Sequence, residues 1–272
     1  MRRRLEDMTV LITGASAGIG RALAEQLSAA GARLTLAARR ADRLESLNQA
    51  LGGHHQVVVT DVADRGECEA LVAAAVAHHG RLDTVVCNAG YGLAKATADT
   101  TADEVSALFR TNVFGTLDTI RAAVPVLRDQ AERDGYRGQL MVVSSAVARR
   151  GLPYFGPYAA TKAAQLSLCE ALRVELRPSG IAVTSVHPVG TETDFFDTAG
   201  RLANTTVPPQ ARGELRQSPA VVARAMVRGI VRPRPEVWPL WLARFGTSLS
   251  TLVPGLTDRA LRNFRRPVAV AP

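Results

Sequence analysis

The stretch Thr13-Gly14-Ala15-Ser16-Ala17-Gly18-Ile19-Gly20 decides the fold class of this 272-residue chain. It joins an apolar run at residues 9–12, which predicts a buried strand, to a helix on which Ile19, Leu23 and Leu27 share one face. Glycines at such a junction allow a tight turn, close approach of a phosphate to the backbone and close packing of helix on strand. Since the first N–H groups of a helix favour an anion, the turn predicts a pyrophosphate site. The expected contacts are Gly14, Ser16, Gly18, Ile19 and Gly20.

Beyond this turn, short β-branched runs alternate with amphipathic stretches, which is typical of a parallel sheet with crossover helices. The expected strands are residues 9–12, 33–38, 56–60, 83–87, 140–144, 181–187 and 236–238. The expected helices after the first are residues 41–51, 64–79, 103–134, 158–176 and 218–228. Pro125 predicts a kink or break in the helix over residues 103–134. Residues 193–217, with Pro208-Pro209, are expected to form a long loop or mobile flap.

The composition excludes several classes of protein. With 47% hydrophobic and 21% charged residues the chain is neither disordered nor collagen-like. Cys68, Cys87 and Cys169 are odd in number and widely spaced, which favours a reducing, cytoplasmic location over a disulfide framework. Residues 1–8 have no apolar stretch behind them, so no secretory leader is expected.

Further motifs follow the turn in a fixed order. Asp61-Val62 follows the third expected strand and Asn88-Ala89-Gly90 the fourth. Asn112 lies in Arg-Thr-Asn-Val, Ser145 comes thirteen residues before Tyr158, and Tyr158 and Lys162 form Tyr-x-x-x-Lys. Pro188-Val189-Gly190-Thr191-Glu192-Thr193 follows the sixth strand. Together with the G-x-x-x-G-x-G turn, this set over about the first 195 residues resembles the short-chain dehydrogenase/reductase family. Cys87 and Val189 depart from the Asn and Gly that the family has there.

The resemblance implies a Rossmann-like, doubly wound parallel sheet of about seven strands with helices on both faces. It implies one domain over residues 1–272, with a cofactor half at about 1–150, a catalytic and substrate half at about 151–235 and a C-terminal extension at about 236–272. It also implies a homodimer or homotetramer. The further nicotinamide-nucleotide contacts that it implies are Asp61, Val62, Asn88, Ala89, Gly90, Tyr158, Lys162, Pro188, Thr191 and Thr193.

Reduction of a ketone needs a hydride at carbon and a proton at oxygen, and a free tyrosine is too weak an acid at neutral pH. Lys162 shares a helix face with Tyr158, so its ammonium is expected to lower the pKa of the phenol. Lys162 is one of only two lysines among 33 basic residues, which fits a requirement for the amine. By resemblance Tyr158 is the general acid and base, Ser145 binds the substrate oxygen, and Asn112 holds a water in the proton relay behind Lys162.

The second strand ends in Arg39-Arg40 with no carboxylate at its tip, and Asp42 belongs to the next helix. A carboxylate there would bind the 2′-hydroxyl of NAD, whereas a guanidinium pairs with the 2′-phosphate of NADP. Arg39 and Arg40 therefore predict a preference for NADP(H) over NAD(H).

The substrate is less legible in the sequence. Ser145, Tyr154 and Phe195 are the candidate contacts, and the apolar residues near them favour a hydrophobic carbonyl compound. A protein that binds the nucleotide without turnover, as a sensor or scaffold, stays open as the alternative. The pairs His54-His55 and His78-His79 lack ligand spacing, so no metal site is expected, and His187 is expected to be a hydrogen-bonded residue at a strand end.

The net charge of +8 is concentrated in the tail, where nine arginines after residue 217 face only Glu236 and Asp258. This favours anionic partners, but no basic and aromatic motif predicts nucleic-acid binding. Residues 237–256 hold both tryptophans, and we expect a buried last strand and a helix that covers the substrate cleft or a subunit contact. Docking of this segment on a membrane surface is the less favoured alternative.

Overall fold

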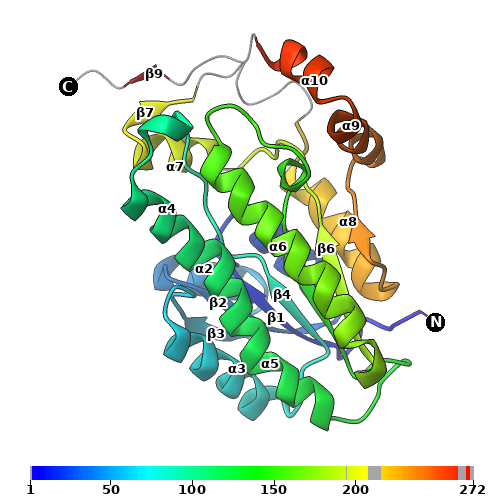
Figure 1. Cartoon of the computed structure of the whole chain (residues 1–272). Helices are drawn as coiled ribbons and strands as arrows, with labels where there is room; N and C mark the ends of the chain where they lie inside the picture. The colour runs from blue at the N-terminus through cyan, green and yellow to red at the C-terminus, as the bar shows by residue number, and fades with distance from the viewer. Residues whose placement is uncertain (1, 194, 208–215, 263–267, 270–272) are drawn as a thin grey trace.

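The computed structural model describes residues 2–193, 195–207, 216–262 and 268–269. At its centre lies a parallel seven-stranded sheet in the order β3-β2-β1-β4-β5-β6-β8 (Figure 1). Its strands are β1 (Thr9–Thr13), β2 (Arg33–Ala38), β3 (Gln56–Val59), β4 (Thr84–Cys87), β5 (Gly138–Val143), β6 (Ile181–Val186) and β8 (Glu236–Val237). The expected doubly wound, Rossmann-like fold is confirmed, with strand bounds within one or two residues of those predicted.

Helices cover both faces of the sheet (Figure 1). Successive side chains of a buried strand point to opposite faces and are apolar on both, so each face needs a covering layer. On β1, Val10 and Ile12 belong to one buried core and Leu11 to the other. The first core is closed by α1 (Gly18–Ala29), α2 (Ala41–Ala50) and α8 (Pro219–Val231). The second is closed by α3 (Arg65–His79), α5 (Gly115–Asp129) and α6 (Gly156–Glu175).

The strand order places the functional edge of the sheet. The chain runs from β1 outward through β2 and β3, then returns to place β4 on the other side of β1. Ligands of such sheets bind at the carboxyl ends of the strands, at the point where the order reverses. The segments that follow β1, β4, β5 and β6 meet at this edge, and they carry the glycine turn, Asn88, Ser145 and Pro188.

The expected long helix over residues 103–134 is wrong in its detail. It is divided into α4 (Ala102–Phe109), a wider π-helical turn η2 (Arg110–Phe114) and α5. The irregularity therefore lies at Asn112, while α5 runs through Pro125 without a break and ends at Asp129. A π turn inserts an extra residue into the ladder of helical hydrogen bonds and is frequent at functional sites. No proline marks the position of this turn in the sequence.

The expected loop over residues 193–217 is also wrong in part. It contains α7 (Phe195–Leu202) and β7 (Thr205–Thr206), and β7 pairs antiparallel with β9 (Val268–Ala269). Residues 208–215, including Pro208-Pro209, lie outside the described residues. After β8 come α9 (Trp241–Leu252) and α10 (Pro254–Leu261). No helix within the described ranges combines the length and the apolar character that crossing a bilayer requires.

Candidate active site

The turn between β1 and α1 forms a cradle that leaves no room for a side chain at Gly14 or Gly20. Gly14 has a φ of +67°, in the left-handed region, and a Cβ on it would lie 2.9 Å from the Cα of Ala89. A Cβ on Gly20 would lie 2.4 Å from the carbonyl oxygen of Gly14. Both glycines are therefore required by the backbone path itself.

Hydrogen bonds tie this turn to the end of β4. The Thr13 hydroxyl accepts from the backbone N–H groups of Asn88 at 3.0 Å and Ala89 at 3.1 Å. The Asn88 side chain donates to the carbonyl oxygens of Thr13 at 3.0 Å and Gly14 at 3.1 Å. Asn88 thus shapes the turn from inside the protein.

The start of α1 has the properties of an anion site. Ala17, which precedes the helix, has no polar side chain and gives no cap to the first N–H groups of α1. Ile19 packs against the core behind the turn. A Cβ on Gly18 would lie 2.9 Å from Cγ2 of Thr193, so the segment after β6 closes over the turn. This arrangement fits the pyrophosphate of a dinucleotide.

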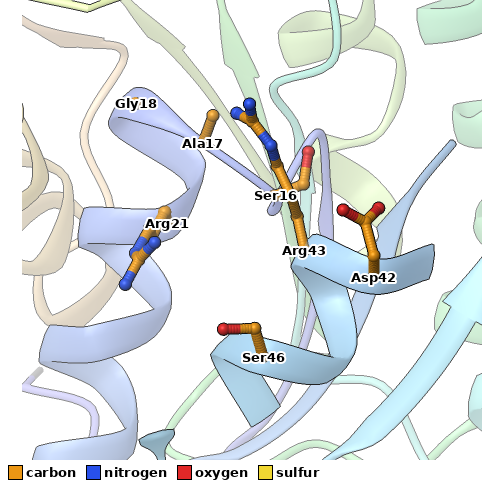
Figure 2. A pocket seen from close by; sticks show the side chains of 7 residues that line it. All are labelled: Ser16, Ala17, Gly18, Arg21, Asp42, Arg43 and Ser46. Carbon is orange, nitrogen blue, oxygen red and sulfur yellow. The ribbon is translucent and has the colours of Figure 1, made fainter. Parts of the chain in front are cut away.

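A pocket of about 400 Å³ opens beside the turn, between α1 and α2 (Figure 2). Figure 2 shows Arg43 of α2 extending beside Ser16. Nη2 of Arg40 donates to Oγ of Ser16 at 3.1 Å. The residues that line the pocket are Ser16, Ala17, Gly18, Arg21, Asp42, Arg43 and Ser46. Guanidinium groups beside a hydroxyl suit a phosphate monoester, and Asp42 is the one acid at the rim of this pocket.

Arg39 lies elsewhere than Arg40. Its Nη1 is 3.9 Å from Oδ2 of Asp61, and its side chain is 70% exposed. The backbone N–H of Asp61 donates to Glu67 at 2.7 Å, which fixes the end of β3. Val62 is buried, and its carbonyl oxygen would lie 2.6 Å from a Cβ on Gly115. The structure therefore places Arg40 against Ser16 of the glycine turn and Arg39 beside Asp61.

The helix α6 brings Tyr158 and Lys162 to the carboxyl end of β5. Nζ of Lys162 lies 5.6 Å from the centre of the Tyr158 ring. Ser145 begins the turn η3 (Ala146–Ala148), where its hydroxyl accepts from the N–H of Val147 at 3.3 Å. The N–H of Ala146 donates to the carbonyl oxygen of Pro188 at 3.0 Å, which joins the ends of β5 and β6. Ser145, Tyr158 and Lys162 therefore come from two segments that face one another.

The electrostatics of this group differ from the sequence-based expectation. Burial raises the pKa of Tyr158 above its ordinary value, and a hydrogen bond with the Ser145 side chain opposes the rise. Burial lowers the pKa of Lys162 to about 7. Because desolvation disfavours the charged form of each group, it outweighs the acidifying effect expected from the neighbouring amine. Within the protein alone, Ser145 is the group that lowers the pKa of the phenol.

Two acceptors within the protein bind the ammonium group of Lys162. Its Nζ donates to the carbonyl oxygen of Val143 at 2.8 Å and to Oε1 of Gln165 at 2.9 Å. Nε2 of Gln165 donates in turn to the carbonyl oxygen of Asn112 at 2.6 Å and to Oγ1 of Thr116 at 2.8 Å. The family resemblance implies a water held by Asn112 behind Lys162, and the side chain of Gln165 bonds both residues there.

The Asn112 side chain faces the other way, toward the end of β4. Its Oδ1 accepts from the N–H of Tyr91 at 3.0 Å, and its Nδ2 donates to the carbonyl oxygen of Tyr91 and to Oγ1 of Thr161, each at 3.0 Å. A Cβ on Gly90 would lie 2.9 Å from Oδ1 of Asn112 and 3.7 Å from Nζ of Lys162. Asn112 and Gly90 thus pack together beside the lysine.

Apolar side chains pack around Tyr158. The ring of Phe195 on α7 is 5.0 Å from the Tyr158 ring, and Tyr154 belongs to the same cluster. Tyr154 has a φ of 65°, an unusual conformation for a bulky residue of the kind that gathers at functional sites. A Cβ on Gly92 would lie 2.4 Å from Cζ of Phe195, so that ring occupies the space beside Gly92. The three candidate substrate contacts, Ser145, Tyr154 and Phe195, therefore surround or adjoin Tyr158.

Three of the five histidines are engaged in hydrogen bonds within the protein. His187 is fully buried, and its ring nitrogens bond Oγ of Ser185 at 2.9 Å and the carbonyl oxygen of Ser145 at 3.2 Å. His55 bonds Ser28 and His79 bonds Thr35. Across the described part of the chain, no group of three or more His, Cys, Asp or Glu side chains is arranged to hold a metal.

The hydroxyl of Thr191 donates to the carbonyl oxygen of Val189 at 2.8 Å, which closes the segment after β6.

A family model described as short chain dehydrogenase matches residues 8–202. This chain belongs to that family. Its members are oxidoreductases that use a nicotinamide nucleotide and act on small molecules, so the sequence-based assignment of the family and enzyme class is confirmed.

Similar proteins match nearly all of this short-chain dehydrogenase. An uncharacterized oxidoreductase of Myxococcus xanthus is 33% identical over 261 residues, which is 94% of this chain and 97% of that protein. An 11-beta-hydroxysteroid dehydrogenase-like protein of Arabidopsis thaliana is 33% identical over 267 residues, 93% of this chain and 83% of that protein.

Solved structures agree with the fold. The alcohol dehydrogenase of the archaeon Thermococcus sibiricus, complexed with 5-hydroxy-NADP, is 29% identical with a TM-score of 0.70, and the match covers 85% of this chain and 95% of that one. A 3-ketoacyl-(acyl-carrier-protein) reductase of Brucella melitensis, complexed with NADH, is 25% identical with a TM-score of 0.76, covering 86% and 97%. Neighbours of this dehydrogenase therefore bind either nicotinamide nucleotide.

Sequence reasoning missed three side chains that the structure places at the site of this dehydrogenase. Arg43 and Arg21 line the pocket beside the glycine turn, from two different helices. Gln165 joins Lys162 to Asn112. The available signals were a third arginine four residues after Arg39, within the next helix, and a glutamine about one turn after the lysine on the buried face of a helix.

Proposed function

We propose that this chain interconverts a ketone and a secondary alcohol with NADPH or NADP⁺, with Tyr158 as the general acid and base. The observation that carries the proposal is the meeting of Ser145, Tyr158 and Lys162 at the carboxyl edge of the sheet, beside the glycine cradle. A hydride donor bound along that cradle would lie next to the phenol.

Bound NADPH supplies the hydride that reaches the carbonyl carbon. The Tyr158 hydroxyl gives its proton to the carbonyl oxygen, which completes the alcohol and leaves a tyrosinate. Ser145 donates a hydrogen bond to the same oxygen as negative charge develops on it. The ammonium form of Lys162 stabilises the tyrosinate, and its pKa of about 7 means that the ammonium is the main form below neutral pH. In oxidation of the alcohol the same groups act in reverse, with tyrosinate as the base.

The pocket beside the turn supports NADP(H) as the preferred nucleotide. Arg40 bonds Ser16, and Arg43 lines the pocket beside Ser16, where the 2′-phosphate of a nucleotide seated on the glycine turn would lie. Two guanidinium groups gain more from a dianionic phosphate than from a hydroxyl. The acid that lines the pocket, Asp42, opposes this gain in part.

The cluster around Tyr158 supports a hydrophobic carbonyl substrate. Phe195 supplies aromatic surface next to the Tyr158 ring, and Tyr154 belongs to the same apolar cluster. Since burial of apolar surface drives binding in such a site, a substrate with an apolar body beside its ketone fits it best.

We include residues 1–235 and the extension after them in one catalytic domain, and we propose a homo-oligomeric assembly.

The decisive experiment follows oxidation of NADPH by the purified protein with a panel of aliphatic, aromatic and polycyclic ketones. We expect turnover with at least one apolar ketone, and a Tyr158→Phe variant that retains NADPH binding but loses about 100- to 10,000-fold in kcat. Tyr136→Phe is the control, because Tyr136 packs beside Arg3, away from the site. Nucleotide binding without turnover of any ketone or alcohol would favour the sensor alternative over this proposal.

A further inference from the structure

The C-terminal helices α9 and α10 carry their large apolar side chains outward. No residue of either helix is buried. Trp241 and Phe245 are each 64% exposed, and Leu252 is 77% exposed. We call the following set the apolar stripe: Trp241, Leu242, Phe245, Leu249, Leu252 and Leu256. The helix that we expected to cover the substrate cleft or a subunit contact buries none of its own residues within the chain, while the buried strand expected before it is confirmed at Val237.

The helix α9 directs its large apolar side chains away from the domain, whereas a helix that packs on a core directs them inward. Its less exposed side carries the small residues Ala243, Thr247 and Ser250, at positions one turn apart. Trp241, Phe245 and Leu249 lie on the outer side at the same spacing, and the Trp241 and Phe245 rings meet edge to face at 5.7 Å. A helix that covered a core would turn these large side chains inward, because their burial stabilises the fold most. The surface of α9 is thus suited to a partner outside the domain.

Ion pairs fix the two helices to the body of the protein. Arg150, in the segment after η3, bonds Asp258 of α10, and Arg149 bonds Glu236 of β8. Nε of Arg244 on α9 lies 3.5 Å from the other oxygen of Glu236. Figure 1 shows α9 and α10 at the periphery, beyond α8 and off the sheet. The apolar stripe is therefore presented from a defined position.

The charges around the stripe are positive. Within α9 and the described residues after it, Arg244, Arg259 and Arg262 are exposed, and Asp258 is the one acid, already bonded to Arg150. Glu236 has a mostly buried side chain and is bonded to Arg149. Two copies of the stripe related by a two-fold axis would bring these arginines toward one another, whereas an anionic surface would neutralise them.

We propose that the apolar stripe docks this protein on the surface of an anionic lipid bilayer. Trp241 and Phe245 enter the interfacial layer, where aromatic side chains are favoured, and Leu249, Leu252 and Leu256 reach the upper acyl chains. Arg259 and Arg262 meet the lipid phosphates. The twelve residues of α9 lie in the plane of the membrane, since they are too few to cross it. This docking is independent of the reaction proposed above.

The test is co-sedimentation of the full chain with vesicles of equal parts phosphatidylglycerol and phosphatidylcholine, beside vesicles of phosphatidylcholine alone. We expect binding to the anionic vesicles that weakens with added salt, and much weaker binding to the neutral ones. Trp241→Ala combined with Phe245→Ala should weaken binding at least about tenfold. Arg259→Gln and Arg262→Gln should each weaken it about fivefold on anionic vesicles.

Val174→Ala is the matched control, because Val174 is an apolar residue of α6 that is 74% exposed outside the stripe. It should bind vesicles as the parent protein does. The stripe residues are exposed, so their variants should keep the parent's thermal midpoint. Failure of the parent chain to bind anionic vesicles, or unchanged binding by the Trp241 and Phe245 variant, would overturn the proposal. A dimer in solution that this variant dissociates, with no vesicle binding, would assign the stripe to contact between copies instead.

Discussion

The side-chain amide of Gln165 joins Lys162 to the backbone of Asn112. Its Oε1 accepts from Nζ of Lys162 at 2.9 Å, and its Nε2 donates to the carbonyl oxygen of Asn112 at 2.6 Å. All three residues are buried. A carbonyl acceptor at this position stabilises the ammonium form of the lysine against the burial that lowers its pKa to about 7. Gln165 is thus a positioning residue for the proposed acid and base.

Replacement of Gln165 should therefore act through the charge of Lys162. We expect Gln165→Leu to lower the pKa of Lys162 further, so that the alkaline limb of the pH profile of kcat/KM moves down by about one unit. Gln165→Glu should move the limb up, because a nearby carboxylate favours the ammonium. Gln139→Leu, at a buried glutamine that bonds Arg3 and Thr184, should lower the thermal midpoint without moving the profile. Equal profiles for the parent and both Gln165 variants would contradict this role.

Arg43 should set the choice of nucleotide. Arg43→Ala should reduce kcat/KM with NADPH by about 10- to 100-fold, because it removes a charged partner of the 2′-phosphate, and should change kcat/KM with NADH little. Steady-state kinetics with both nucleotides measures the ratio. Arg65→Ala, at an exposed arginine that pairs with Glu69 on α3, serves as the control. The assignment of the pocket is wrong if the parent enzyme prefers NADH or if Arg43→Ala leaves the ratio unchanged.

Phe195 should determine how apolar substrates are held. Its ring packs at 5.0 Å from that of Tyr158, so Phe195→Ala should raise KM for an apolar ketone by about tenfold through loss of buried aromatic surface. Gly92→Ala should act in the same direction, because the added methyl group would lie 2.4 Å from Cζ of Phe195 and displace the ring. Phe114→Ala, at a half-exposed ring on η2, should leave KM unchanged. Unaltered KM in both site variants would remove Phe195 from the proposed substrate contacts.

His187 should make the fold less stable in acid. Burial lowers its pKa from 6.5 to about 4, so the unfolded chain binds more protons than the folded one between these values. The free energy of unfolding should therefore fall as the pH drops from about 6.5 to about 4, and His55 and His79, whose pKa values are also lowered to about 4, add to the same trend.

Urea unfolding at a series of pH values measures this dependence. His187→Asn, which keeps a polar side chain but cannot charge, should flatten the curve between pH 6.5 and pH 4. Val174→Asn, at an exposed position of α6 that carries no ionisable group, should leave the slope as in the parent protein. A steeper slope in His187→Asn would show that the buried imidazole does not resist protonation.

The sequence by itself determined the local parts of this protein. The glycine turn, the order of strands and helices and the one-turn spacing of Tyr158 and Lys162 depend on residues close in the chain, so periodicity and turn chemistry disclose them. The doubly wound, parallel arrangement follows from the same pattern, because parallel strands joined by helices have few arrangements. The break allowed for at Pro125 does not occur, since α5 continues through this proline and the irregular turn lies at Asn112.

Only the tertiary structure decided which distant side chains meet. Gln165 and Asn112 are 53 positions apart, and Arg43 and Arg21 belong to different helices. Their contacts depend on how α2, α6 and the π turn pack against the sheet. The outward orientation of α9 is of the same kind, because an amphipathic pattern marks an apolar face without saying what that face meets. The burial that raises the pKa of Tyr158 and lowers that of Lys162 also belongs to the packed fold, since desolvation arises from neighbours that the chain order does not reveal.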